Sequence, residues 1–309
     1  MQLKLSILII VFILIGCGGA KGGSDSKPTS GNPDDKQSQQ TPPQSTTEGR
    51  DIPTAWKLGD AASNEKVTLV TSDQIEIAAN YRPPAGTPTG KVPALICVPM
   101  LGKTKETYDE FTAHLSEIGI ASLAIDVRGH GESTMKGSLR YGSFKEQQWQ
   151  DCLKDLNAAF GWLLNRDDID DRHIGFVGAS IGANFVLMGG TRNEVGMVVA
   201  LSPGLDYHGV TPKDYAAKIK GKPVYMVATD GDKYSADSVS AIAQAMDPAT
   251  KVKIIENRKE HGTDMFRIPF FQEELIRWIK DQFDAMVREE LNVDNPVKKG
   301  KAGAITGNP

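Results

Sequence analysis

Residues 174–188 read IGFVGASIGANFVLM and decide the fold of this chain. The first four form a short apolar run typical of a buried strand, and residues 181–188 fit a buried helix. Between them, residues 178–182, GASIG, match the pattern G-x-S-x-G. Its glycines permit a tight strand-to-helix turn that exposes a serine hydroxyl at the carboxyl end of a sheet. This context predicts that Ser180 is a nucleophile.

Strand-like and helix-like stretches alternate on both sides of this turn. The predicted strands are 67–70, 75–81, 92–98, 120–125, 174–177, 196–201, 224–228 and 252–255, and the predicted helices are 108–118, 144–164, 181–188, 212–219, 235–245 and 271–287. The alternation predicts an α/β fold, a mostly parallel, doubly wound sheet of about eight strands with helices on both faces. Residues 65–81 predict an antiparallel hairpin at its edge. The short connection between Leu201 and Val224 predicts little or no lid.

The stretch 144–164 is predicted as one amphipathic helix. Its apolar face is expected to contain Trp149, Leu153, Leu156, Phe160 and Leu164.

A nucleophilic serine needs a general base, and the chain contains five histidines. His261 follows the last predicted strand, on a loop long enough to reach back over the sheet, and is the predicted base. His173 precedes the strand of the nucleophile, at the end of the sheet away from Ser180. His114 lies on a predicted helix and His130 in the shaping loop. His208 lies in a loop that could line a pocket.

Two aspartates compete for the role of the acid that orients this base. Residues 227–232, VATDGD, end a predicted strand, so Asp230 and Asp232 both follow its carboxyl end. An Asp-Gly pair forms turns without any catalytic role, which is enough to explain Asp230. We therefore predict Asp232 as the acid, with Asp230 as the alternative. The chain order serine, acid, histidine differs from the chymotrypsin-like and subtilisin-like orders.

A further motif carries a resemblance to a known family. Residues 126–133, DVRGHGES, resemble the D-x-R-G-x-G-x-S loop that follows the fourth strand of α/β-hydrolases. With GASIG, Asp-Gly-Asp and the late His-Gly, the resemblance extends over residues 67–284. It is closest to the dienelactone-hydrolase-like and peptidase-like branches, and implies a serine hydrolase that needs no cofactor and no metal.

The turn at residues 98–102, VPMLG, departs from the His-Gly that many members of this family carry. An oxyanion hole uses backbone N–H groups, so the side chains there are not decisive. By alignment to that turn, Leu101 is the predicted first donor and Met100 the alternative. Ile181, after the nucleophile, is the second. Pro99 has no N–H to donate.

The amino terminus, MQLKLSILIIVFILIGC, has a basic residue followed by an apolar run too short to span a bilayer. It predicts a signal peptide over residues 1–16. Its end resembles the lipobox of bacterial lipoproteins, which implies cleavage before Cys17 and lipidation of that cysteine, for example with palmitate. We therefore expect export to the cell envelope and anchoring to its membrane, with an outer membrane or cell surface favoured over the cytoplasm.

Composition separates the remaining segments. Residues 17–50 are rich in Gly, Ser, Pro, Gln and Thr and are predicted to form a flexible tether after the lipidated cysteine. Residues 51–291 form the predicted hydrolase domain, and residues 292–309 the predicted disordered tail. Of the three cysteines, Cys97 and Cys152 fall in the domain and are expected to be free thiols, because an apolar strand interior such as that of Cys97 usually holds a buried thiol. A disulfide between them is the alternative in an exported protein.

The net charge of −4 and the lack of a basic stripe exclude nucleic acid as an expected partner. The sequence favours a carboxylesterase-like serine hydrolase that cleaves a small ester-like substrate through an acyl-enzyme. Peptidase, thioesterase and acyltransferase activities on the same three residues remain alternatives, as does a surface lipoprotein that binds without catalysis.

Overall fold

A computed structural model describes residues 54–294 of the chain. The predicted signal peptide, the lipidated Cys17, the tether and nearly all of the predicted tail lie outside these residues. The strands are β1 Glu65–Val70, β2 Glu76–Arg82, β3 Val92–Val98, β4 Ala121–Ile125, β5 Ile169–Ala179, β6 Val195–Leu201, β7 Val224–Thr229 and β8 Lys251–Ile255. The α-helices are α1 Asp109–Glu117, α2 Glu146–Asp151, α3 Leu153–Leu164, α4 Ile181–Gly189, α5 Lys213–Ala216, α6 Lys233–Ala243 and α7 Phe271–Asp294.

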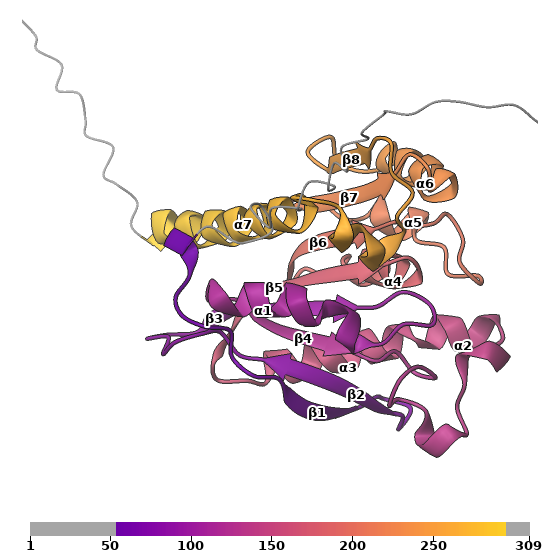
Figure 1. Ribbon diagram of the computed structural model, residues 1–309, viewed down its shortest axis with the longest axis horizontal. Helices are drawn as coiled ribbons and strands as arrows, with labels where there is room; N and C mark the ends of the chain where they lie inside the picture. The colour runs from indigo at the N-terminus through magenta and orange to yellow at the C-terminus, as the bar shows by residue number, and fades with distance from the viewer. Residues whose placement is uncertain (1–53, 295–309) are drawn as a thin grey trace, which may run out of the picture. The chain divides into compact units, whose positions relative to one another are not determined.

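The eight strands form a single sheet in the order β1-β2-β4-β3-β5-β6-β7-β8. Figure 1 shows this order from β1 at the bottom of the view to β8 at the top. β2 is antiparallel to both of its neighbours, β1 and β4. Every pair from β4 to β8 is parallel, so the carboxyl ends of these strands meet at one edge of the sheet. The predicted sheet and its antiparallel opening hairpin are confirmed.

Helices cover both faces of the sheet, which explains why its central strands are apolar throughout. One face packs against α3, α4 and α6 through a cluster that includes Phe160, Phe185 and Val239. The other face packs against α1 and α7 through a cluster that includes Phe111 and Leu275. The sheet is therefore doubly wound, as its sequence pattern predicts.

Cys97 and Cys152 are both free and buried, as expected. Cys97 lies inside β3, where its side chain is fully buried among apolar neighbours. Burial raises the pKa of its thiol well above the ordinary value. The thiol is therefore protonated and unreactive, and it serves as a small apolar group in the core.

The prediction of one continuous helix over residues 144–164 is wrong. The structure contains two helices, α2 and α3, with a turn at Cys152 between them. Leu163 is fully buried, whereas Leu164, which a continuous helix places on the apolar face, is 38% exposed.

The connection between β6 and β7 contains only the four-residue helix α5, in agreement with the expected absence of a large lid. Among the helices of residues 54–294, none combines the length and the apolar character needed to cross a bilayer.

Candidate active site

The candidate nucleophile lies on a strained turn at the carboxyl edge of the sheet. Ser180 directly follows β5 and precedes α4, and its φ of 54° lies in the left-handed region that non-glycine residues rarely occupy. The flanking glycines allow this turn. A Cβ on Gly178 would lie 2.2 Å from the carbonyl oxygen of Gly182, and a Cβ on Gly182 would lie 2.5 Å from that of Val98. Backbone segments therefore approach too closely for any side chain at either position.

The candidate base reaches this turn from the loop that follows β8. The Nδ1 atom of His261 lies 2.6 Å from Oδ2 of Asp232. The next residue, Gly262, has a positive φ of 56°, and a Cβ there would lie 3.3 Å from that of Ala179, the neighbour of Ser180. The loop after β8 thus packs directly against the turn of Ser180.

Two neighbouring aspartates have different partners in the structure. Asp232 binds His261, whereas the carboxylate of Asp230 accepts the backbone N–H groups of Asn257 and Arg258 at 2.9 and 3.1 Å. Burial acts to raise the pKa of Asp232, but the hydrogen bonds from His261 and Ser235 outweigh it and lower the pKa below its ordinary value. Asp232 is therefore ionised beside the imidazole, while Asp230 closes a turn. This geometry favours Asp232 over the alternative.

The turn after β3 packs against the amino end of α4, where the oxyanion donors are predicted. Ile181 is the first residue of α4, so its N–H has no acceptor within the helix and lies at the positive end of the helix dipole. The turn that holds Met100 and Leu101 lies against this helix end. A Cβ on Gly182 would be only 2.6 Å from the carbonyl oxygen of Pro99. Met100 is buried and Leu101 is partly exposed.

Three residues that the sequence analysis did not select surround the candidate triad. Ser202, directly after β6, accepts the Gly262 N–H at 2.9 Å and is fully buried with a positive φ of 52°. Ser235 in α6 helps to lower the pKa of Asp232. Tyr207 lies edge-on to the His261 ring, with 6.5 Å between ring centres. Their only signal in the sequence is a position at the carboxyl edge of the predicted sheet.

A buried lysine connects the segment after β3 to the D-x-R-G-x-G-x-S loop. The ammonium group of Lys105 lies 2.8 Å from Asp126 and 2.7 Å from Glu132, and the side chains of Lys105 and Asp126 are at most 2% exposed. Asp126 also accepts the backbone N–H groups of Lys105 and Glu132. The lysine and this carboxylate therefore hold two loops of the site together.

Arg128 connects the same loop to the hairpin and to α3. Its guanidinium group makes two hydrogen bonds to Asp73, at 2.8 and 3.0 Å, and it lies 2.7 Å from the buried carboxylate of Asp155. The motif loop is thus fixed on both sides by charged groups.

The other four histidines are placed as follows. His130 has a ring nitrogen 3.2 Å from the carbonyl of Arg128, in agreement with a structural role, and its ring stacks on that of Tyr141. His208 stacks on Trp149 near the site. His114 and His173 each contact the carboxylate of a nearby residue.

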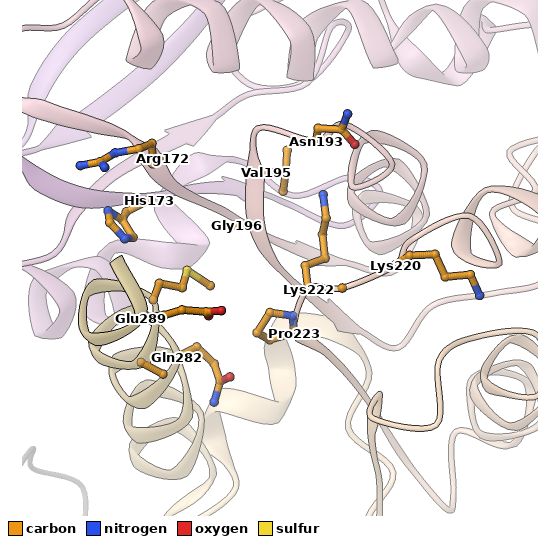
Figure 2. A pocket seen from close by; sticks show the side chains of 13 residues that line it. Arg172, His173, Asn193, Val195, Gly196, Lys220, Lys222, Pro223, Gln282 and Glu289 are labelled. Carbon is orange, nitrogen blue, oxygen red and sulfur yellow. The ribbon is translucent and has the colours of Figure 1, made fainter. Parts of the chain in front are cut away.

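A cavity of about 380 Å³ lies at the opposite edge of the sheet, lined by the amino ends of β6 and β7 and by α7. Figure 2 shows that its cationic side chains do not converge, since Lys222 points toward Asn193 while Arg172 and Lys220 point in other directions. The ammonium group of Lys222 donates to the carbonyls of Gly190 and Arg192, at the end of α4. Residues 54–294 also contain no cluster of His, Cys, Asp and Glu suited to a metal.

Comparisons with solved structures agree with this architecture. A dienelactone hydrolase from Anabaena variabilis matches with a TM-score of 0.58 at 16% identity, over 74% of this chain and 99% of that chain. An acetyl xylan esterase from Paenibacillus sp. R4 matches with a TM-score of 0.60 at 17% identity, over 75% and 87%. An esterase from Pyrococcus furiosus matches with a TM-score of 0.56 at 18% identity, over 72% and 91%. At these identities the similarity shows the fold alone.

A search of curated protein sequences finds no match. The model of one protein family, described as serine aminopeptidase S33, matches residues 92–262, which is more than half of the chain. The matched segment contains strands β3 to β8, the turn of Ser180 and the candidate base His261. The chain therefore belongs to the serine aminopeptidase S33 family of α/β-hydrolases.

Proposed function

We propose that this protein is a serine hydrolase that cleaves an ester bond of a small substrate through an acyl-enzyme. One observation carries the proposal: the 2.6 Å contact between His261 and Asp232, on a loop packed against the turn of Ser180. An ionised carboxylate at Nδ1 selects the tautomer in which Nε2 is unprotonated and can accept the serine proton.

The reaction follows from these positions. His261 removes the proton of Ser180 as its Oγ attacks the carbonyl carbon, and Asp232 stabilises the imidazolium that forms. The N–H groups of Ile181 and Leu101 hold the oxyanion, each donor being worth about 3 kcal/mol in comparable sites. The imidazolium then protonates the leaving group. Water, activated by the same base, releases the acyl group from Ser180.

The names of the related proteins point to two types of bond. The family description names an aminopeptidase, while the names of two structures similar in fold describe esterases. A carbonyl flanked by an easily expelled alkoxide needs only the three side chains and the two donors proposed above. Ester hydrolysis therefore makes the smallest demand on this site.

The test is reaction of the purified protein with a fluorophosphonate, followed by mass spectrometric mapping of the adduct. We expect one adduct, on Ser180, which disappears in Ser180→Ala and His261→Ala and remains in Ser240→Ala, a matched change on the exposed face of α6. Turnover of an ester, a thioester and an aminoacyl anilide with comparable acyl groups then identifies the bond. A folded protein that forms no adduct would contradict the proposal and support a binding lipoprotein.

We also propose that Cys17, outside the described residues, carries a lipid that anchors the protein in the cell envelope. Its position after LIG supports this assignment. In a bacterial host, Cys17→Ser should move the protein from the membrane fraction to the soluble fraction, and an unchanged distribution would contradict it.

A further inference from the structure

Tyr207, in the connection between β6 and α5, places a phenol group inside the candidate active site. Its hydroxyl lies 3.2 Å from Oγ of Ser235 and 3.3 Å from the carbonyl oxygen of Ser202. Its ring meets that of His261 nearly at right angles, with 6.5 Å between ring centres. One side chain therefore contacts the serines next to the acid and the base itself.

The loop that carries Tyr207 is fixed to the helix that begins at the nucleophile. Asn184, in the first turns of α4, accepts the N–H of Gly204 at 3.0 Å and donates to the carbonyl of Val210 at 2.7 Å. Tyr207 and Val210 exchange backbone hydrogen bonds of 3.3 and 2.9 Å. The phenol is thus held at a defined position relative to Ser180.

Gly204 provides the space in which the Tyr207 ring lies. A Cβ at this position would lie 2.6 Å from two carbons of the ring and 2.8 Å from the ring of Tyr234. Any side chain here would displace the phenol. The backbone is therefore shaped around this tyrosine.

The phenol is a neutral donor close to the nucleophile. Burial raises the pKa of Tyr207, while hydrogen bonding to the hydroxyls of Ser235 and Ser180 acts in the opposite direction. A neutral phenol has one O–H to donate and can also accept. Its two measured contacts, at 3.2 and 3.3 Å, are long for hydrogen bonds between oxygens, so the O–H can be drawn to a better acceptor.

We propose that Tyr207 is a further catalytic residue, whose O–H donates to Oγ of Ser180 and thereby directs the serine proton toward His261. This inference rests on the proposed function. The Oγ atom carries partial negative charge both when it attacks the substrate and when it leaves the acyl-enzyme. One donor therefore assists both halves of the reaction, and no proton moves from Tyr207 itself.

The role predicts a specific kinetic signature. In Tyr207→Phe, kcat and the second-order rate of fluorophosphonate inactivation should both fall by about 10- to 100-fold, less than for a donor to the full oxyanion. KM should change little, because the phenol acts on Oγ and not on the bound substrate. Gly204→Ala keeps the hydroxyl but displaces it, so it should reproduce the same loss.

Tyr225→Phe is the matched control. This buried tyrosine of β7 also donates one hydrogen bond, 3.2 Å long, to Glu274 of α7 on the far face of the sheet. A structural role of the Tyr207 hydroxyl would lower the melting temperature of Tyr207→Phe and Tyr225→Phe alike and leave the inactivation rate of both unchanged.

The experiment measures the inactivation rate of the full chain and its variants across pH, together with melting temperatures. A rate that falls in Tyr207→Phe and Gly204→Ala but not in Tyr225→Phe supports the inference. If wild type reacts at Ser180 and Tyr207→Phe reacts equally fast, the inference is wrong and the proposed function stands. If wild type does not react at all, both are wrong.

Discussion

The carboxylate of Asp232 lies 2.6 Å from Nδ1 of His261, whereas the carboxylate of Asp230, two residues earlier, binds the backbone of the loop after β8. The two aspartates share one turn and the same strand end, yet only Asp232 contacts the imidazole. Asp230 instead stabilises the loop on which His261 lies. One side chain therefore acts on the base and the other on the loop backbone.

This difference predicts opposite results for two similar substitutions. Asp232→Asn should lower kcat by about 10⁴-fold while the protein stays folded, because the amide no longer selects the reactive tautomer. Asp230→Asn should lower the melting temperature and leave kcat within a few-fold of wild type. Ester turnover and thermal unfolding of both variants test this, and a larger kcat loss in Asp230→Asn would assign the acid to Asp230.

The contact between Gly182 and the turn after β3 predicts a severe effect of one methyl group. In Gly182→Ala the new Cβ would lie 2.5 Å from the Val98 oxygen and 2.6 Å from the Pro99 oxygen. The turn must move, and a shift of about 1 Å in a catalytic group can lower the rate about 100-fold. We therefore expect a loss of kcat/KM of at least about 100-fold, measured on an ester substrate.

Gly161→Ala is the matched control, since a Cβ at this position of α3 meets nothing within 4 Å. It should keep full activity and raise the free energy of unfolding by about 0.5–1 kcal/mol, because alanine favours the helix. Equal activities for the two alanine variants would contradict the close-contact account.

Lys105 should be among the most sensitive positions outside the triad. Its side chain and that of Asp126 are 2% and 0% exposed, and removing one partner leaves a buried charge without compensation. Lys105→Met should lower the free energy of unfolding by about 3–5 kcal/mol, measured by urea titration. Lys66→Met removes an exposed ion pair to Glu132 and should cost less than about 1 kcal/mol. Similar losses in both would refute a special role for the buried pair.

The pair of Arg128 and Asp73 predicts how stability depends on pH. Hydrogen bonding to Arg128 lowers the pKa of Asp73 below its ordinary value of 3.8. The carboxylate of Asp73 therefore binds a proton less readily in the folded chain than in the unfolded chain. The ion pair stabilises the folded chain above pH 3.8, and this stabilisation is lost as the pH falls below that value.

Asp73→Asn should accordingly destabilise the protein at pH 7 and reduce the difference in stability between pH 7 and pH 3. Urea midpoints across this range measure the effect. Asp237→Asn is the control, because it removes only an ion pair to Lys233 in which both side chains are at least 66% exposed. Parallel pH profiles for wild type and Asp73→Asn would show that this pair does not determine acid stability.

Local patterns in the chain were sufficient to predict the fold. The bounds predicted for β3, 92–98, are those observed, because a strand buried on both faces has an uninterrupted apolar run. The turn at Ser180 was predictable for a similar reason, since its two glycines and the flanking strand and helix are contiguous. Both features are encoded by residues that are contiguous in the sequence.

The selection among candidate partners depended on tertiary structure. Asp230 and Asp232 have equivalent positions in sequence, and the packing of the loop after β8 determines which of them meets His261. Loops have no periodicity, so their conformations do not follow from residue patterns. The break at Cys152 is a second example, because nothing in the helical period of residues 144–164 indicates it.

The surroundings of the triad were the least accessible to sequence reasoning. Ser202, Tyr207 and Ser235 follow two different strands and carry no motif, yet the parallel sheet brings them together around Asp232 and His261. Apolar periodicity and a glycine-flanked serine determine which fold forms and where its proposed nucleophile lies. Which polar groups support that nucleophile is decided by contacts between loops distant in sequence, because only the folded sheet sets the distances between them.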